Sequence, residues 1–322
     1  MQIQYSRMDK VFLTHLHGDH TSDLITIYCF GPSVDRKVPL RVWGPSADTP
    51  EQGTKAFCDT LYKLMEWHRH SFSFIATGLK PPAGYDSYDG FDIIATELEY
   101  MEVGGIAYQN ETTGVTIRHF PALHARNGSI SYKLEWNGMS MIFSGDTKPN
   151  DFMIEQGKGV DVLIHEMVVP PEVWAAKNSG FQEGDAAWDQ ALQLTKDIED
   201  SSHTPQKAFG YIMSQTNPRL AVATHFQADD ETVGPALDDI RRFYDGDVTI
   251  ATDLLVIDVS KDDIRLRQGD VSDFAWYPPN PKIYNPQDFA APMYPTPTAQ
   301  LSDELLAHVV QPILYNPALP PA

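Results

Sequence analysis

The chain has 322 residues, enough for about two average domains or for one large layered α/β unit. Hydrophobic residues make up 42% and charged residues 21%, which excludes a wholly disordered chain. The formal net charge of −20 disfavours polyanionic partners, and the only two cysteines, Cys29 and Cys58, exclude a disulfide framework and are expected to be buried thiols.

The N-terminal segment carries no targeting signal that we can recognise. Residues 1–10 are polar and mixed in charge, and no apolar run approaches the roughly 18 residues of a membrane span. The sequence therefore predicts no signal peptide and no membrane partner, which leaves the cytoplasm as the default location.

The first half of the chain shows strand and helix patterns in alternation. Residues 10–14 are β-branched and apolar and lead into a polar, His-rich turn, and Asn137-Gly138 is a typical hairpin turn. Elements are expected as follows: strand 10–14, helix 23–30, strand 40–43, one long helix from a cap at 49–52 to about His70, loop 77–92, and strands 93–96, 115–120, 129–136 and 140–143.

The second half continues the alternation, which indicates mixed sheets covered by helices. Pro170-Pro171 and Asn217-Pro218 are interpreted as turns. The expected elements are strand 160–165, helices 185–199 and 205–214, strand 220–224, helix 231–244, and strands 248–251 and 254–259.

The last stretch differs in composition, and it sets the expected domain boundary. Residues 277–322 contain 11 of the 24 prolines, so continuous helix or sheet is excluded there. Residues 1–276 are expected to form one domain and residues 277–322 a Pro-rich tail. The tail contains one short apolar helix at 302–310, which either packs on the body or docks a partner.

A dense cluster of metal-binding residue types follows the first strand. His15, His17, Asp19 and His20 form a His-x-His-x-Asp-His pattern. Three imidazoles and a carboxylate this close together favour a bound cation, and zinc prefers such nitrogen and oxygen ligands. The alternative is a solvated polar turn.

Three further ligand candidates each follow an apolar strand. They are His124, Asp146 and His225, after strands 115–120, 140–143 and 220–224. Loops at strand ends are where sheets present ligands to a shared edge. Together with the first cluster, these residues predict a two-metal site.

These motifs resemble those of the metallo-β-lactamase-fold hydrolases, in the branch that contains ribonuclease Z and related arylsulfatases. The matching segments are THLHGDH at 14–20, FSGDTKP at 143–149, LIHE at 163–166, SHT at 202–204 and THF at 224–226. The resemblance implies an α/β fold, namely an αβ/βα four-layer sandwich of two mixed sheets flanked by helices.

The resemblance also implies a role for each ligand. His15, His17 and His124 would hold one metal ion, Asp19, His20 and His225 a second, and Asp146 would bridge both. The expected cofactors are two Zn²⁺, with Mn²⁺ or Fe²⁺ as substitutes.

The implied reaction is metal-assisted hydrolysis. Asp19 can orient or deprotonate the attacking water. The resemblance implies that Glu166 and His203 correspond to a pair, found in the ribonuclease Z branch, that assists protonation of the leaving group. Because successive strand residues face opposite sides, His165 is assigned to the core. His68, His70, His119 and His308 are expected in surface or core positions.

Two departures from the family pattern bear on the expectations. Only 14 residues precede His15, so the opening strands are expected to be shortened or supplied from elsewhere. A second departure lies in residues 125–145, which contain no basic arm of the kind that grips tRNA in bacterial ribonuclease Z.

The expected function is hydrolysis of a small phosphodiester, sulfate ester or related bond. The partner is then a small-molecule ester, nucleic acid is disfavoured, and a homodimer is left open. The alternatives are a ribonuclease Z-type tRNA 3′ endonuclease, a β-lactamase, and a non-catalytic metal sensor.

Overall fold

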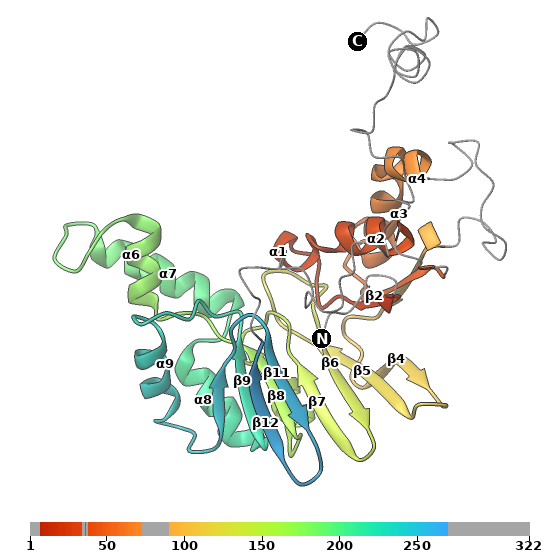
Figure 1. The fold of residues 1–322 in the computed structure, drawn as a ribbon. Coiled ribbons are helices and arrows are strands. Elements are labelled where there is room, and N and C mark those ends of the chain that lie inside the picture. The colour runs from red at the N-terminus through yellow and green to blue at the C-terminus, as the bar shows by residue number, and fades with distance from the viewer. Residues whose placement is uncertain (1–6, 34–35, 37, 73–89, 270–322) are drawn as a thin grey trace, which may run out of the picture. The chain divides into compact units, whose positions relative to one another are not determined.

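The computed structural model describes residues 7–33, 36, 38–72 and 90–269 (Figure 1). Most of the expected loop at 77–92 lies outside these residues. The expected boundary between residues 276 and 277, and the helix expected at 302–310, lie outside them as well. All statements below concern the described residues.

The first sheet has the strand order β1-β2-β3, and both pairings are parallel. Helices from the same half of the chain cover one face, because Tyr28 and Cys58 pack against Leu40 and Val42. The elements are β1 (Lys10–Phe12), α1 (Gly18–Thr21), α2 (Leu24–Ser33), β2 (Leu40–Pro45), the 3₁₀ turn η2 (Pro50–Gln52), α3 (Thr54–Leu64), α4 (Glu66–Phe72) and β3 (Ile93–Leu98).

The second sheet has seven strands in the order β10-β9-β8-β7-β6-β5-β4. The strands from β10 to β7 pair in parallel, whereas those from β7 to β4 pair antiparallel, so this sheet is mixed. Its strands are β4 (Gly105–Asn110), β5 (Val115–Pro121), β6 (Ile130–Trp136), β7 (Met139–Phe143), β8 (Val162–Glu166), β9 (Leu220–Thr224) and β10 (Val248–Ile250).

Aromatic side chains join the two sheets face to face. Val42 points to the helices of the first sheet, so its neighbour Trp43 points the other way, as the alternation of a strand requires. Trp43 stacks on Phe12, with 4.8 Å between ring centroids, and both rings contact side chains of the second sheet, including Tyr132. The sheets therefore form the two inner layers of the molecule.

The outer face of the second sheet is covered by α5 (Asp151–Gly157), α8 (Gln206–Thr216) and α9 (Val233–Ile240). Leu163 of β8 packs against these helices, while Val162 packs on the opposite side against a hairpin of β11 (Leu255–Val259) and β12 (Ile264–Gln268). The α/β fold class and its layers of two sheets flanked by helices are thus confirmed (Figure 1).

The single long helix expected up to His70 is wrong. Gly53 is extended (φ −86°, ψ 173°) and separates η2 from α3, and Met65 (φ −92°, ψ 18°) separates α3 from α4. Thr49 makes no capping hydrogen bond, so the sequence pattern of a helix start marks only a 3₁₀ turn. The apolar spacing that suggested one helix belongs mainly to α3, where Phe57, Cys58 and Leu61 pack on the core under the first sheet.

The interpretation of Pro170-Pro171 as a turn is also wrong. Pro171 is the first residue of α6 (Pro171–Ser179), a position where the missing N–H has no helical partner to lose. Helix α5 and strands β4 and β12 are further elements that the sequence did not predict. Strand β12 is short and largely exposed, so it lacks the apolar run by which the other strands were found.

Two smaller expectations can be compared with the structure. Cys29 and Cys58 are both buried, as predicted. Within the described ranges, no helix has the combined length and apolar character that crossing a bilayer requires.

Candidate metal centre

The loop after β1 carries His15 and His17 and is fixed to the second sheet. The backbone N–H of Ile130 donates to the Thr14 carbonyl at 2.9 Å, and the hydroxyl of Tyr132 donates to the Leu13 carbonyl at 2.9 Å. Both bonds cross between the sheets, so they place the start of the His-rich loop against β6. The rings of His15 and His17 project from this anchored segment.

Asp19 and His20 lie on the one-turn helix α1. The hydroxyl of Thr21 donates to the His17 carbonyl at 2.9 Å, which closes the turn around both residues. Asp19 remains 65% exposed, and its Oδ2 lies 3.2 Å from His20 Nε2. The short helix thus turns Asp19 and His20 toward the same site as the preceding histidines.

The other candidates come from strand ends at one edge of the second sheet. Strands β5, β7, β8 and β9 run in the same direction, and His124, Asp146, Glu166 and His225 lie at or just after their carboxyl ends. His225 has a left-handed backbone (φ 56°), a conformation that costs about 1–2 kcal/mol for a residue with a Cβ. Such strain is typical of functional sites.

A glycine is required beside Asp146. Gly145 has a φ of 61°, and a Cβ at this position would lie 2.5 Å from Cβ of Thr14. The turn that carries Asp146 therefore packs directly against the His-rich loop. A larger residue would separate Asp146 from the histidines.

The first group comprises His15, His17, His124 and Asp146. Nδ1 of His17 lies 3.1 Å from Nε2 of His15 and 3.1 Å from Nε2 of His124. Oδ2 of Asp146 lies 3.7 Å from His15 Nε2 and 3.9 Å from His124 Nε2. One ligand atom from each residue lies within 4.8 Å of all the others, so the group could hold one metal ion.

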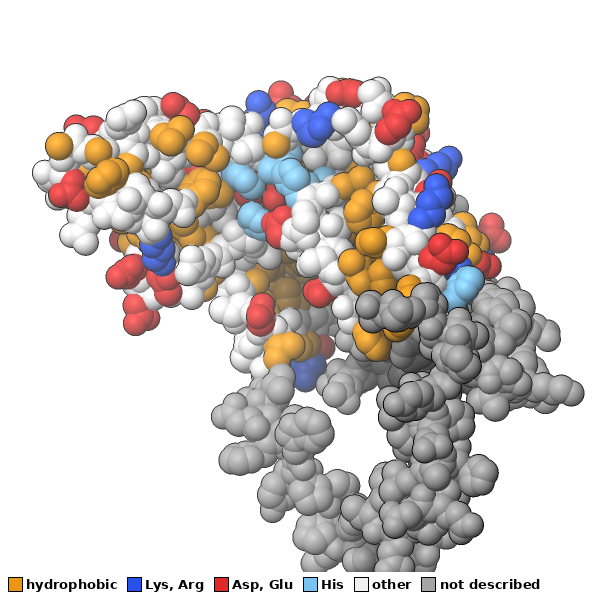
Figure 2. Space-filling model, turned by 90° about the horizontal axis from the view of Figure 1, so that it is seen from above, with side chains coloured by type: hydrophobic (Ala, Val, Ile, Leu, Met, Phe, Trp, Pro, Cys, Tyr) orange, Lys and Arg blue, Asp and Glu red, His pale blue; other side chains and the backbone are white. Residues whose placement is uncertain are grey.

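The second group comprises Asp19, His20, Asp146 and His225. The same Asp146 Oδ2 lies 3.1 Å from His20 Nε2 and 3.4 Å from His225 Nε2, and Asp19 Oδ2 lies 3.5 Å from His225 Nε2. The structure thus brings together all seven predicted ligands, with Asp146 in both groups. Figure 2 shows histidines gathered beside carboxylates on this face.

The protonation of the cluster suits a divalent cation. Burial, together with repulsion from His20, lowers the pKa of His15 to about 3, so its imidazole is neutral. Burial opposes ionisation of Asp146, yet its contacts with His20 and His225 hold the pKa of this carboxyl well below its usual value. The hydrogen bond to Asp146 raises the pKa of His20, so a cation bound at the second group would replace the proton on that imidazole.

A backbone contact selects the tautomer of His124. Burial lowers the pKa of His124, which leaves one ring proton, and Nδ1 donates it to the Ser202 carbonyl at 2.8 Å. The Nε2 lone pair is then directed at the first group. This arrangement, a ligand imidazole with its other nitrogen held by an oxygen, is common in metal sites.

Glu166 and His203 form a pair next to the second group. His203 Nδ1 lies 3.0 Å and 3.2 Å from the two carboxylate oxygens of Glu166, and the Thr147 N–H donates to Oε1 at 2.7 Å. Burial raises the pKa of Glu166. Burial opposes protonation of His203, but the hydrogen bond to Glu166 raises its pKa overall. Both residues also lie within ligand distance of His225, so a metal role for them is a geometric alternative.

The remaining described histidines lie away from the cluster. His165 is buried, as predicted, and its ring packs edge-on against Phe209. His68 Nε2 contacts the Cys29 carbonyl at 3.1 Å, and His119 contacts the carbonyls of Gly105 and Glu99. His70 is exposed on α4, while His308 lies outside the described residues.

Glu199 is a buried carboxyl on α7 (Trp188–Ser202), the helix for which His203 is the C-cap. Its side chain is 2% exposed, and Oε1 has no hydrogen-bond partner among the described residues. Burial, followed by repulsion from Asp200 and Glu172, raises its pKa to about 8. The neutral acid is thus the form that the folded protein prefers.

Replacing Glu199 with glutamine is expected to remove a pH dependence of stability. A raised pKa in the folded state stabilises the protein at pH values below the ordinary glutamate pKa of 4.5, and this contribution is lost as the pH rises through about 8. Glu199→Gln should therefore unfold like the wild type at pH 5 and be more stable by a few kcal/mol at pH 9, measured by urea unfolding. Glu155→Gln, at an exposed position on α5, is the control. If Glu199→Gln loses as much stability between pH 5 and pH 9 as the wild type does, Glu199 is not the source of this pH dependence.

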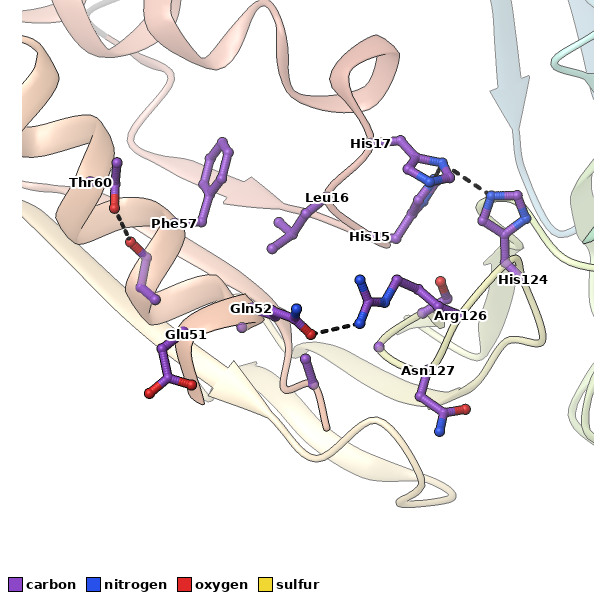
Figure 3. Close-up of a pocket in the computed structure, with 15 residues that line it drawn as sticks. His15, Leu16, His17, Glu51, Gln52, Phe57, Thr60, His124, Arg126 and Asn127 are labelled. Carbon is purple, nitrogen blue, oxygen red and sulfur yellow. Dashed lines mark hydrogen bonds between the residues drawn. The ribbon is translucent and has the colours of Figure 1, made fainter. Parts of the chain in front are cut away.

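A cavity of about 510 Å³ adjoins the first group, and Figure 3 shows its lining. The sequence pointed to His15, His17 and His124 in this lining as functional residues, but to none of the other lining residues. Among these are Gln52 from η2, Phe57 from α3 and Arg126 from the loop after β5. The position of Arg126, two residues after a predicted ligand, is the one signal that could have drawn attention to it.

The family of the chain follows from a sequence match that spans the site. Residues 2–226 match the model of the β-lactamase superfamily domain. This range contains all seven candidate ligands together with Glu166 and His203. The chain therefore belongs to the β-lactamase superfamily domain family, and the resemblance drawn from the motifs is confirmed.

Similar proteins include two with curated names. Ribonuclease BN of Proteus mirabilis (strain HI4320) is 26% identical over 220 residues, which cover 60% of this chain and 68% of that protein. Ribonuclease Z of Methanosarcina mazei is 23% identical over 279 residues, or 78% of this chain and 81% of that protein.

Two solved structures also align with this chain. One is the short form of human tRNase Z, with a TM-score of 0.49 and 18% identity, covering 78% of this chain and 79% of that one. The other is the metallo-β-lactamase fold protein YhfI of Bacillus subtilis, with a TM-score of 0.48 and 14% identity, covering 77% of this chain and 76% of that one.

Proposed function

We propose that this protein is a binuclear metal-dependent hydrolase that acts on small phosphodiesters. The observation that carries the proposal is the sharing of Asp146 Oδ2 between two groups of ligand candidates, with the Glu166–His203 pair beside the second. Two divalent cations at these groups would supply Lewis-acid polarisation of a phosphoryl oxygen and stabilise its developing charge. Zinc suits the imidazole and carboxylate donors best, with Mn²⁺ or Fe²⁺ as substitutes.

The chain's own residues would perform the proton transfers. Asp19, exposed at the mouth of the cluster, is placed to accept a hydrogen bond from the attacking water and orient it. His203, held by Glu166 in a form that favours protonation, is placed to donate a proton to the leaving alkoxide. These roles distinguish a hydrolase from a metal sensor, because neither Glu166 nor His203 is needed to complete the two ligand groups.

A tRNA 3′ endonuclease is the second candidate, and the names of the similar proteins favour it. Two features rank it below small esters. The chain carries a net charge of −20, whereas tRNA binding depends on Lys and Arg contacts to phosphates. In addition, β6 and β7 are joined by the tight turn at Asn137 and Gly138, with no basic arm between His124 and Asp146.

Metal removal tests the proposed function. We expect the metal-replete protein to hydrolyse bis(p-nitrophenyl) phosphate, to lose this activity with a chelator and to regain it with Zn²⁺, Mn²⁺ or Fe²⁺. An aryl sulfate, a chromogenic β-lactam and a precursor tRNA would be assayed at the same enzyme concentration. Faster, salt-sensitive cleavage of the tRNA would favour the endonuclease. No turnover of any substrate by protein that holds metal would favour a sensor.

A further inference from the structure

The cavity beside the first ligand group has a two-part lining. His15, His17 and His124 form one wall, with the loop at 126–129 beside it, and η2 and the first half of α3 line the other side (Figure 3). Its volume of about 510 Å³ is within the range of small-molecule sites. A substrate whose scissile bond lies at the histidines would therefore extend one of its two arms into this cavity.

Arg126 is the only Lys or Arg among the residues that line the cavity. In the described part of the chain, no carboxylate lies within ion-pair distance of its guanidinium. The nearby Asp48 is engaged elsewhere, because it accepts hydrogen bonds from Asn127 and Tyr100. The glutamate of the lining, Glu51, points away from Arg126 in Figure 3. Arg126 is therefore a positive group at the cavity without a carboxylate partner among the described residues, although the chain has a net charge of −20.

Gln52 fixes the direction of the Arg126 side chain. Nη2 of Arg126 donates to Oε1 of Gln52 at 2.7 Å, and the Gln52 backbone N–H donates to the Thr49 carbonyl at 3.1 Å. The other N–H groups of Arg126 have no protein partner among the described residues. A guanidinium held in this way can offer two parallel donors to a phosphate or carboxylate.

The rest of the lining is partly apolar. Leu16, Ala56 and Phe57 also line the cavity. Such a surface suits a short hydrocarbon or aromatic stem but does not bind an anion itself. The arm that fits would therefore have an apolar stem and a charged end.

Building on the proposed function, we infer that the cavity binds a substrate arm that ends in a second, non-scissile anionic group, and that Arg126 determines this specificity. The substrate class is then a phosphodiester with a terminal phosphate or carboxylate on one of its alcohols. The histidine wall would hold the scissile end, and Arg126 the anionic group of the arm.

Matched substrates test the inference kinetically. Three p-nitrophenyl phosphodiesters would be compared, in which the second alcohol is a four-carbon chain that ends in phosphate, carboxylate or methyl. We expect the wild type to prefer a charged arm by about tenfold or more in kcat/KM, mainly through KM, as one charge-assisted contact allows. The better of the two charged arms identifies the anion. In Arg126→Gln, the ratio of kcat/KM for the charged substrate to kcat/KM for the neutral substrate should be close to one. Arg242 is an exposed arginine two residues after the end of α9. Arg242→Gln should leave the ratio unchanged.

A binding measurement separates this inference from the proposed function. Phenyl phosphate would be titrated calorimetrically into the full chain after chelation, at pH 8, where ordinary histidines are neutral. Wild type should bind about tenfold more tightly than Arg126→Gln, whereas Gln52→Leu should bind with intermediate affinity. Equal binding by wild type and Arg126→Gln, or a wild type without preference for charged arms, would overturn the inference. Absence of all turnover with the binding difference intact would overturn only the proposed function.

Discussion

Replacing Asp146 with asparagine is expected to produce the largest effect of any single substitution in the cluster. One oxygen of this carboxylate contacts histidines of both groups, at distances from 3.1 to 3.9 Å. The amide removes the negative charge that the two groups share. We expect metal content to fall from about two equivalents in the wild type to well below one, and kcat/KM for a phosphodiester to fall on the order of 10³-fold.

Elemental analysis and steady-state kinetics would check this result. Asp59→Asn makes the same change at an exposed position on α3 and should alter neither quantity. If Asp146→Asn retains the full metal content, this carboxylate is not a ligand, and the assignment of a shared bridging residue is wrong.

Substitutions of Glu166 and His203 should separate catalysis from metal binding. We expect Glu166→Gln and His203→Ala to keep their metal and to lose on the order of 10²-fold in rate, the usual scale for a general acid. Glu166 acts through His203, since its carboxylate holds the imidazole at 3.0 Å and favours protonation. Loss of metal in either variant would instead make that residue a ligand, as its distance from His225 allows.

Leaving-group and pH dependence distinguish proton donation from a structural role. The rate loss should be small for nitrophenyl esters, which need little protonation, and large for alkyl esters. The pKa of His203 should fall when the Glu166 carboxylate is removed. Activity should therefore decline at a lower pH in Glu166→Gln than in the wild type as the pH rises. Glu183→Gln, at an exposed site, should keep the wild-type profile. An equal loss for all leaving groups would indicate disrupted packing.

Elements with a strong local pattern were predictable, and those defined by packing were not. The strands that became β2 and β9 are mainly apolar runs with clear ends, because most of their residues are buried. Strand β12 is stabilised by its partner β11 and by burial of part of one face against β8 and β9, which no local pattern records. The breaks at Gly53 and Met65 are changes of backbone conformation that the apolar spacing of this segment does not reveal.

The candidate ligands could be named from the sequence because metal-binding residue types are rare in dense clusters and occur here at strand ends. What the sequence alone determined was this inventory, His15, His17, Asp19, His20, His124, Asp146 and His225, together with the α/β fold class. Only the tertiary structure decided that one oxygen of Asp146 reaches both groups, and that Arg126, hydrogen-bonded to Gln52, lines the same cavity as three of the histidines. The reason is that local patterns encode which face of an element is buried, whereas distances across the site arise from the packing of one sheet on the other.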